Sequence, residues 1–277
     1  MDTISTTIAS MSRHWRRVAR DRMMGVMTDP EPGFVPFTLP DLSEDERQAR
    51  GRAWFEELDR RRSVRDFSDA PVSRTCIEWA IRAASTAPSG AHRQPWTFVA
   101  VSADETKKRI REAAEREEHS FYEGGRAPDE WLDALRPIGT HWQKPFLETV
   151  PWIVVVFEQL SGYDETGRRQ RNYYTKESVG IACGLFVAAL HRMGLVTLTH
   201  TPSPMGFLRE ILGRPSNERP FILFPVGRPA DDCRVPDLRR KELDEVAIFD
   251  PRPQRPRGTG PESTPDPTPD PTPGDDR

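Results

Sequence analysis

The sequence predicts an α+β domain in which short strands and amphipathic helices alternate irregularly. Apolar runs rich in β-branched and aromatic residues at 97–101, 152–158 and 221–227 have the length of buried strands. Segments with apolar residues at helical spacing lie between these runs, and the chain has no internal repeat. We therefore expect a layered domain in which helices cover a sheet.

The first predicted elements are two helices with N-terminal capping signals. Ser43 and Glu46 form a capping box, which predicts a helix to about residue 61. Ser73 caps a second helix, and the loop 86–96 ends it. The first helix should bury Trp54, Phe55 and Leu58, and the second Ile77, Ala80, Ile81 and Ala84.

The middle of the chain mixes strands with charged helices. A strand at 97–101 precedes a second capping box, Ser102 and Glu105, which should open a helix toward Tyr122. Residues 129–144 have a helical pattern that Pro137 interrupts, and 152–158 is the clearest buried strand. Next come an apolar helix at 177–193 ended by Gly194, a strand at 194–199, a short helix at 205–213 and the strand at 221–227.

Both ends of the chain differ from this predicted folded domain, which spans residues 34–250. Residues 251–277 hold nine prolines and no aromatic residue, which predicts a disordered tail. Residues 1–33 include a basic stretch at 12–22, which we interpret as part of a flexible N-terminal arm; a basic helix on a membrane surface is the alternative.

Composition excludes several classes of protein. The 277 residues include 40 basic and 43 acidic side chains, a net charge of -3 that argues against a nucleic-acid partner. No apolar run approaches the roughly 18 residues of a membrane span, so we expect no stable membrane anchor. Three cysteines without a CxxC pair, and histidines without ligand spacing, predict a cytoplasmic protein with no metal site.

Two segments carry chemistry. Residues 60–65 hold four arginines and a serine in RRRSVR, and the two N–H groups of an arginine side chain can pair with two phosphate oxygens. The loop Ala87–His92 contains Pro88 and Gly90, whose backbone can approach a flat ligand closely. A solvated charge run and a plain connection are the alternatives. No GxGxxG follows a strand, which argues against a dinucleotide site of that type.

Six segments, in order along the chain, resemble the nitroreductase superfamily. They are RRSVRDFSDAPV, TAPSGAHRQPWTFV, ESVGIACGLFVAALHRMGLVTLTHTP, LGRP, PVGRP and VPDLRRK. More narrowly, residues from about Phe34 to Phe249 resemble the iodotyrosine deiodinase family. The resemblance implies a nitroreductase-like fold, with a central, mostly antiparallel sheet flanked by helices, in an intertwined homodimer. It also implies one FMN at each subunit interface.

The resemblance also assigns cofactor contacts. The phosphate and ribityl chain would lie against Arg61, Arg62, Ser63, Arg65 and Arg240. The isoalloxazine would lie along Pro88, Ser89 and Gly90 and near Thr199, His200 and Thr201. Thr201 matches the threonine whose hydroxyl approaches flavin N5, a contact that would favour single-electron steps over hydride transfer. His200 departs from the threonine expected at its position.

The substrate implied by the resemblance is a halotyrosine. Glu118 would bind its ammonium, and Tyr122 and Lys144 its carboxylate, while the backbone N–H of Ala91 would meet the phenolate. We therefore predict reductive dehalogenation, with electrons from an NAD(P)H-dependent reductant. The alternatives are a broad-specificity nitroreductase or quinone reductase using hydride transfer, and a non-catalytic flavin or halotyrosine-binding protein.

Overall fold

The computed structural model describes residues 33–250. The predicted tail at 251–277 and nearly all of the predicted arm at 1–33 lie outside the described residues. The chain divides into two compact units, residues 1–60 and residues 61–277, which are described separately.

The described part of the first unit contains one helix, α3 (Glu44–Asp59). Its predicted capping box is confirmed, because the Ser43 side chain accepts from the Glu46 N–H and the Glu46 carboxylate accepts from the Ser43 N–H. The predicted burial of an apolar face is wrong, since Trp54 is 44% and Phe55 65% exposed. Residues 33–60 offer no second helix or strand for this face to pack against.

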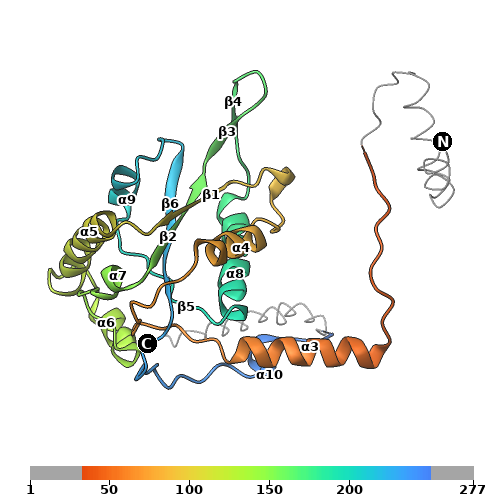
Figure 1. Ribbon diagram of the computed structural model, residues 1–277, viewed down its shortest axis with the longest axis horizontal. Coiled ribbons are helices and arrows are strands. Elements are labelled where there is room, and N and C mark those ends of the chain that lie inside the picture. Colours follow the sequence, from red (N-terminus) through yellow and green to blue (C-terminus); the bar gives the residue numbers. More distant parts are fainter. Residues whose placement is uncertain (1–32, 251–277) are drawn as a thin grey trace, which may run out of the picture. The chain divides into compact units, whose positions relative to one another are not determined.

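The second unit is built on a four-stranded sheet with the order β1-β2-β6-β5, and every neighbouring pair is antiparallel (Figure 1). The strands are β1 (Trp96–Val101), β2 (Trp152–Gln159), β6 (Glu218–Gly227) and β5 (Val196–Thr197). The sheet confirms the three predicted strand runs and their antiparallel pairing. The predicted strand at 194–199 is shorter, because only two of its residues pair with β6.

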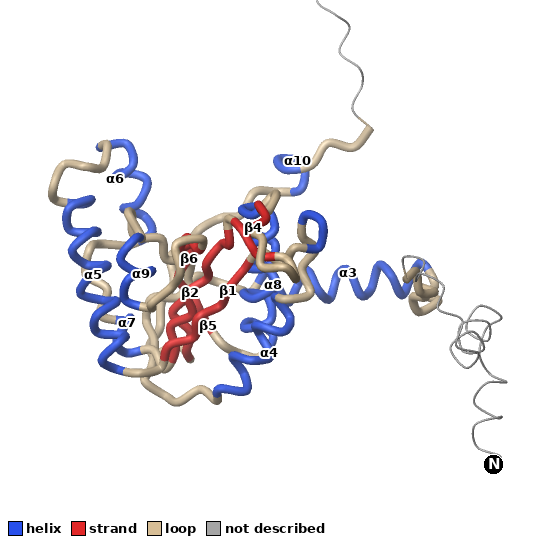
Figure 2. The backbone as a smooth tube through the Cα atoms, turned by 90° about the horizontal axis from the view of Figure 1, so that it is seen from above, coloured by secondary structure: helices blue, strands red, loops and turns tan. Residues whose placement is uncertain are grey.

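Helices cover both faces of the sheet, as Figure 2 shows. The core on one face contains side chains of α4 (Arg74–Ala84) and α8 (Thr175–Arg192). The core on the other contains side chains of α5 (Asp104–Tyr122), α7 (Phe146–Thr149) and α9 (Gly206–Ile211). In β2, Val154 and Val156 face the first core, and Val155 and Phe157 face the second. This strand is continuously apolar because both its faces are buried.

Two helix ends differ from prediction. The capping box at Ser102 and Glu105 is wrong, because α5 begins after Ala103 without a side-chain cap. Buried Lys107 fixes this first turn instead, by pairing with Asp104 at 3.0 Å and donating to two backbone carbonyls. The helix predicted to reach residue 144 ends early, as α6 (Asp129–Leu135) and the 3₁₀ turn η2 (Arg136–Ile138), because Gly139 adopts a left-handed φ of 67°.

Other elements were not predicted. They are the 3₁₀ turn η1 (Gly90–His92), the helices α7 and α10 (Leu243–Val246), and the hairpin of β3 (Ser161–Tyr163) and β4 (Arg169–Arg171). The hairpin extends from one end of the sheet in Figure 1. The remaining predicted helices are confirmed, including the end of α8 at Gly194, whose φ is 70°.

Candidate active site

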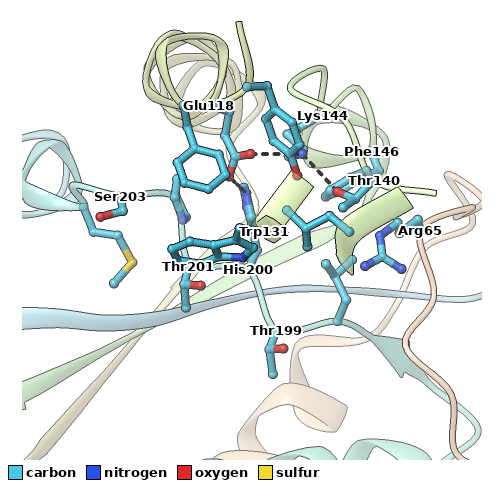
Figure 3. Close-up of a pocket in the computed structure, with 16 residues that line it drawn as sticks. Arg65, Glu118, Trp131, Thr140, Lys144, Phe146, Thr199, His200, Thr201 and Ser203 are labelled. Carbon is cyan, nitrogen blue, oxygen red and sulfur yellow. Dashed lines mark hydrogen bonds and ion pairs between the residues drawn. The ribbon is translucent and has the colours of Figure 1, made fainter. Parts of the chain in front are cut away.

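A pocket of about 450 Å³ lies beside the C-terminal part of α5. It brings together Arg65, Glu118, Tyr122, Lys144, Thr199, His200 and Thr201 of the predicted site residues. Figure 3 shows several of these side chains converging from segments far apart in the sequence. The pocket also has apolar walls, to which Phe121, Trp131, Leu135, Phe146, Leu198 and Met205 contribute.

Local structure positions three of the four predicted substrate residues, all except Ala91. Glu118 and Tyr122 are four residues apart in the last turns of α5, so they share one face of the helix. Lys144 follows the η2 turn and immediately precedes α7, where its backbone N–H donates to Glu115 of α5 at 2.6 Å. This hydrogen bond brings the lysine to the helix that carries Glu118 and Tyr122.

Glu118 is the centre of a buried charged cluster. One carboxylate oxygen, Oε2, lies 3.3 Å from Lys144 Nζ, and the other, Oε1, lies 3.2 Å from His200 Nε2. The Glu118 side chain is 12% exposed and those of Lys144 and His200 are 4% and 6% exposed. Figure 3 shows this cluster on one side of the pocket.

Burial and mutual attraction shift the pKa of each of these groups in opposite directions. Burial opposes ionisation of Glu118, but the hydrogen bond from His200 and the charge of Lys144 outweigh it, so the Glu118 pKa lies below its ordinary value. Burial lowers the pKa of Lys144 and of His200, because the attraction of Glu118 only partly offsets the loss of solvation. The site therefore favours an ionised glutamate beside a neutral imidazole.

Lys144 also has neutral partners in the pocket. Its ammonium lies 3.4 Å from the Thr140 hydroxyl, donates to the His141 carbonyl, and lies 5.5 Å from the centroid of the Tyr122 ring. The ammonium therefore keeps partners if its pair with Glu118 opens. Thr140 was not predicted, and residues 140–144 are not helical, so no helical spacing signals this contact.

Backbone pairing brings Arg65 to the threonine segment. The Val64 N–H donates to the Thr197 carbonyl at 3.2 Å, and Ser63 forms a parallel bridge with Thr197. His200 pairs with Leu223 of β6 through both backbone groups, at 2.9 and 3.0 Å. Thr199 and Thr201, on either side of His200, are exposed and line the pocket.

The other predicted phosphate ligands form a cationic group outside the pocket lining. Arg240 donates to the Arg61 carbonyl at 2.7 Å, and Arg62 donates to the Pro236 carbonyl. Burial, and then repulsion from Arg240 and Arg62, lower the pKa of Arg61. An anion at this position would relieve the repulsion. Ser63 in the same segment is exposed.

The loop Pro88–Ala91 does not line the pocket of the same chain. A Cβ on Gly90 would lie 2.9 Å from the Tyr173 carbonyl, which explains the glycine, and the Gly90 N–H lies 3.4 Å from the Ser178 hydroxyl. Ala91, His92 and Gln94 have left-handed φ values of 49°, 53° and 46°. Such strain in residues other than glycine is concentrated at functional sites.

Several pocket residues were missed by sequence reasoning. Trp131 of α6 packs edge-on against Phe121 at 5.2 Å. Arg126, which does not line the pocket, connects the α5–α6 segment to the Ser203 carbonyl at the pocket edge and pairs with Glu117 at 3.2 Å. The signal that could have revealed Trp131 is an aromatic residue in an otherwise polar segment.

Across residues 33–250, no helix is long and apolar enough to cross a membrane. The same residues contain no group of three or more His, Cys, Asp and Glu side chains that could hold a metal ion.

Comparisons with known proteins identify the family to which this chain belongs. The sequence model described as "Nitroreductase family" matches residues 58–228. Iodotyrosine deiodinase from Haliscomenobacter hydrossis is 50% identical over 218 residues, which are 79% of this chain and 98% of that protein. Iodotyrosine deiodinase 1 from Mus musculus is 44% identical over 215 residues, 77% of this chain and 75% of that protein.

A solved structure supports the same relationship. A crystal structure of oxidized iodotyrosine deiodinase bound to FMN and 3-iodo-L-tyrosine matches with a TM-score of 0.60 and 31% identity. The match covers 71% of this chain and all of that one. The chain belongs to the nitroreductase family, in its iodotyrosine deiodinase branch.

Proposed function

We propose that this protein is an FMN-dependent enzyme that reductively dehalogenates halotyrosines, such as iodotyrosine to tyrosine and iodide. The observation that carries the proposal is the Glu118–Lys144 pair at 3.3 Å in the same pocket as Arg65, Thr199 and Thr201. A buried carboxylate and ammonium side by side match the two charges of an amino-acid zwitterion. The solved relative that binds FMN and 3-iodo-L-tyrosine supports this assignment.

The residues present fit FMN. Arg61, Arg62 and Arg240 bring three guanidinium groups together, and a bound phosphate would relieve the repulsion between them. Arg65 lines the pocket, and burial lowers its pKa, so a nearby anion would also stabilise its charge. The exposed hydroxyls of Thr199 and Thr201 can donate to a flavin ring, with Thr201 assigned to N5.

The zwitterion would replace the Glu118–Lys144 pair. The substrate ammonium takes the place of Lys144 at Glu118, and Lys144 turns to the substrate carboxylate together with the Tyr122 hydroxyl. Trp131 and Leu135 of the connecting segment line the pocket and can cover the aromatic ring. Closure over the ring excludes water and strengthens these charged contacts.

The net reaction replaces the carbon–halogen bond of the ring with carbon–hydrogen, consuming two electrons and one proton and releasing halide. When bound, FMN would supply the electrons, which it receives from an NAD(P)H-dependent reductant. The protein holds the halotyrosine ring, orients the zwitterion and places the Thr201 hydroxyl. In this proposal, the backbone N–H of Ala91 donates to the phenolate oxygen.

Ala91 and the residues Pro88–Gly90 reach the site only in a homodimer, which we propose as the functional form. The loop does not line the pocket of its own chain. Three apolar side chains near this loop or on the adjoining α8 are exposed, as expected of an interface: Tyr173 by 59%, Tyr174 by 71% and Ile181 by 47%.

The free thiols of Cys76, Cys183 and Cys233 support a cytoplasmic location.

Turnover of iodotyrosine by the dithionite-reduced FMN-bound protein, with tyrosine and iodide measured, tests the proposal. Release of both products in equal amounts is expected. Binding of iodotyrosine without turnover would instead indicate a binding protein. Rapid reduction of nitroaromatics or quinones with no iodide release would indicate a general reductase.

A further inference from the structure

His200 is held more rigidly than the other partner of Glu118. Its backbone forms both hydrogen bonds with Leu223 of β6, and its ring lies edge-on to Phe146 with the centroids 6.2 Å apart. The residue is 6% exposed. Its imidazole therefore has a fixed position relative to the sheet.

The contact with Glu118 fixes how the imidazole carries its proton. The Glu118 carboxylate is ionised and only accepts hydrogen bonds, so Nε2 at 3.2 Å from Oε1 must carry the hydrogen. Nδ1 of the neutral ring is then a bare acceptor, and it is buried with no hydrogen-bond partner among the described residues. The protein leaves one ring nitrogen unsatisfied and aims the other at Glu118.

The two oxygens of Glu118 thus have partners of different mobility. Lys144 holds Oε2 through a long side chain whose ammonium also contacts Thr140 and His141. Lys144 can leave Glu118 without losing all its partners, whereas His200 cannot follow a ligand because its backbone belongs to the sheet edge.

We propose that His200 is a positioning residue that keeps Glu118 oriented toward the substrate ammonium while Lys144 moves to the substrate carboxylate. The proposal rests on the halotyrosine function proposed above and deepens it. It gives a further residue, besides Glu118, Tyr122 and Lys144, a part in selecting an amino acid over a simple halophenol. A ligand without an ammonium makes no use of Glu118 and gains nothing from His200.

The surrounding charges suit this role. A protonated His200 would neutralise Glu118 and compete with the substrate ammonium. The charged groups that face His200 are Glu118 on α5, Lys144 before α7 and Arg65 in the segment paired with Thr197. Burial, followed by the two cations, favours the neutral ring, and only Glu118 opposes them. Glu118 therefore keeps a full negative charge for the ligand.

A matched pair of variants tests the proposal. The amide nitrogen of glutamine reaches the position of Nε2, whereas that of asparagine, one methylene shorter, reaches only the position of Nδ1. In the FMN-bound protein, quenching of flavin fluorescence gives the affinities for 3-iodotyrosine and for iodophenol. We expect His200→Asn to weaken iodotyrosine binding by about 10- to 100-fold, the effect of losing a hydrogen bond to a charged group, and His200→Gln to retain most of it.

These measurements distinguish a positioning role of His200 from a purely structural one. In His200→Asn, the loss of iodophenol affinity should be much smaller than the loss of iodotyrosine affinity, with all affinities measured on FMN-saturated protein. Equal iodotyrosine affinity in all three proteins would overturn the proposal, as would an equal loss for iodophenol in His200→Asn. Wild-type protein that binds iodotyrosine no better than iodophenol would instead contradict the proposed function. If His200→Asn fails to fold, His200→Leu replaces it, with the same expected selective loss.

Discussion

Lys144 and Glu118 form an ion pair of 3.3 Å that is almost entirely shielded from solvent. Removing one partner of such a pair leaves an uncompensated buried charge, which destabilises a protein more than removing both. The pair is therefore a site where function and stability can be measured in the same variants.

We predict that Glu118→Gln and Lys144→Gln each weaken iodotyrosine binding by about one to two orders of magnitude, since each loses a charged contact worth roughly 1.5 to 3 kcal/mol. FMN should stay bound in both. In urea denaturation, each single variant should lose up to about 3 to 5 kcal/mol, and the double variant less than the sum. Additive losses would contradict energetic coupling of the two residues.

Thr201→Ala should retain FMN but dehalogenate iodotyrosine more slowly, because the hydroxyl assigned to flavin N5 is gone. Hydride-type reduction of nitro compounds should be maintained or increased. Thr201 is exposed, so the melting temperature should change little. Thr199→Ala is the matched control, and a larger loss of iodide release in that variant would move the N5 assignment to Thr199.

Arg240→Ala or Arg62→Ala should weaken FMN retention, measured as flavin absorbance after dialysis. Each variant removes a charged donor that we assign to the phosphate. Arg239→Ala provides a neighbouring control, because Arg239 is exposed and pairs with Glu242 and Glu245. Equal flavin content in all these variants would indicate that the cationic group does not bind phosphate.

Acid should destabilise the protein partly through Glu218. Burial opposes its ionisation, but Arg214, at 2.7 and 2.9 Å, and the Thr97 hydroxyl outweigh burial and lower its pKa. A carboxyl with a lowered folded-state pKa contributes stability above its unfolded value and loses it as the pH falls through the folded value. The melting temperature should therefore fall between about pH 5 and pH 3, with a smaller fall in Arg214→Leu.

Iodotyrosine should protect the α5–α6 connection from trypsin. Arg126 in this connection is exposed and contacts the Ser203 carbonyl at the pocket edge. A bound zwitterion would add contacts at Glu118 and Lys144 on both sides of it, which lowers the population of open states. Slower cleavage at Arg126 with iodotyrosine, and unchanged cleavage with iodophenol, is the expected result. Equal protection by both ligands would contradict a zwitterion clamp.

Local patterns predicted much of this fold. The alternation of β2 between two cores follows from its continuous apolar run, and the shared face of Glu118 and Tyr122 follows from helical spacing. The capping box at Ser102 failed because the tertiary contacts of Lys107 fix the first turn of α5. The polar β3–β4 hairpin has no alternating apolar pattern from which it could be predicted.

The site was predictable only in part. The residues themselves came from the resemblance, but their convergence depends on contacts between distant segments. The Ser63–Thr197 bridge and the Glu118–His200 contact span long stretches of sequence and leave no periodic signal. The role that we propose for His200 depends on the contact between α5 and the segment paired with β6, which no local pattern predicts.

The bridge between Ser63 and Thr197 limits the insertions that the chain can accept in this segment. Phe67 pairs with Pro229, the Ser68 N–H donates to the Arg228 carbonyl, and Val64 donates to Thr197, so residues 63–68 are attached to the sheet at both ends. Inserting one residue between these attachments would turn Arg65 away from the pocket, because a one-residue shift in an extended chain reverses the side to which side chains point. Homologous chains could therefore vary the exposed Asp66 in type but not the length of this segment.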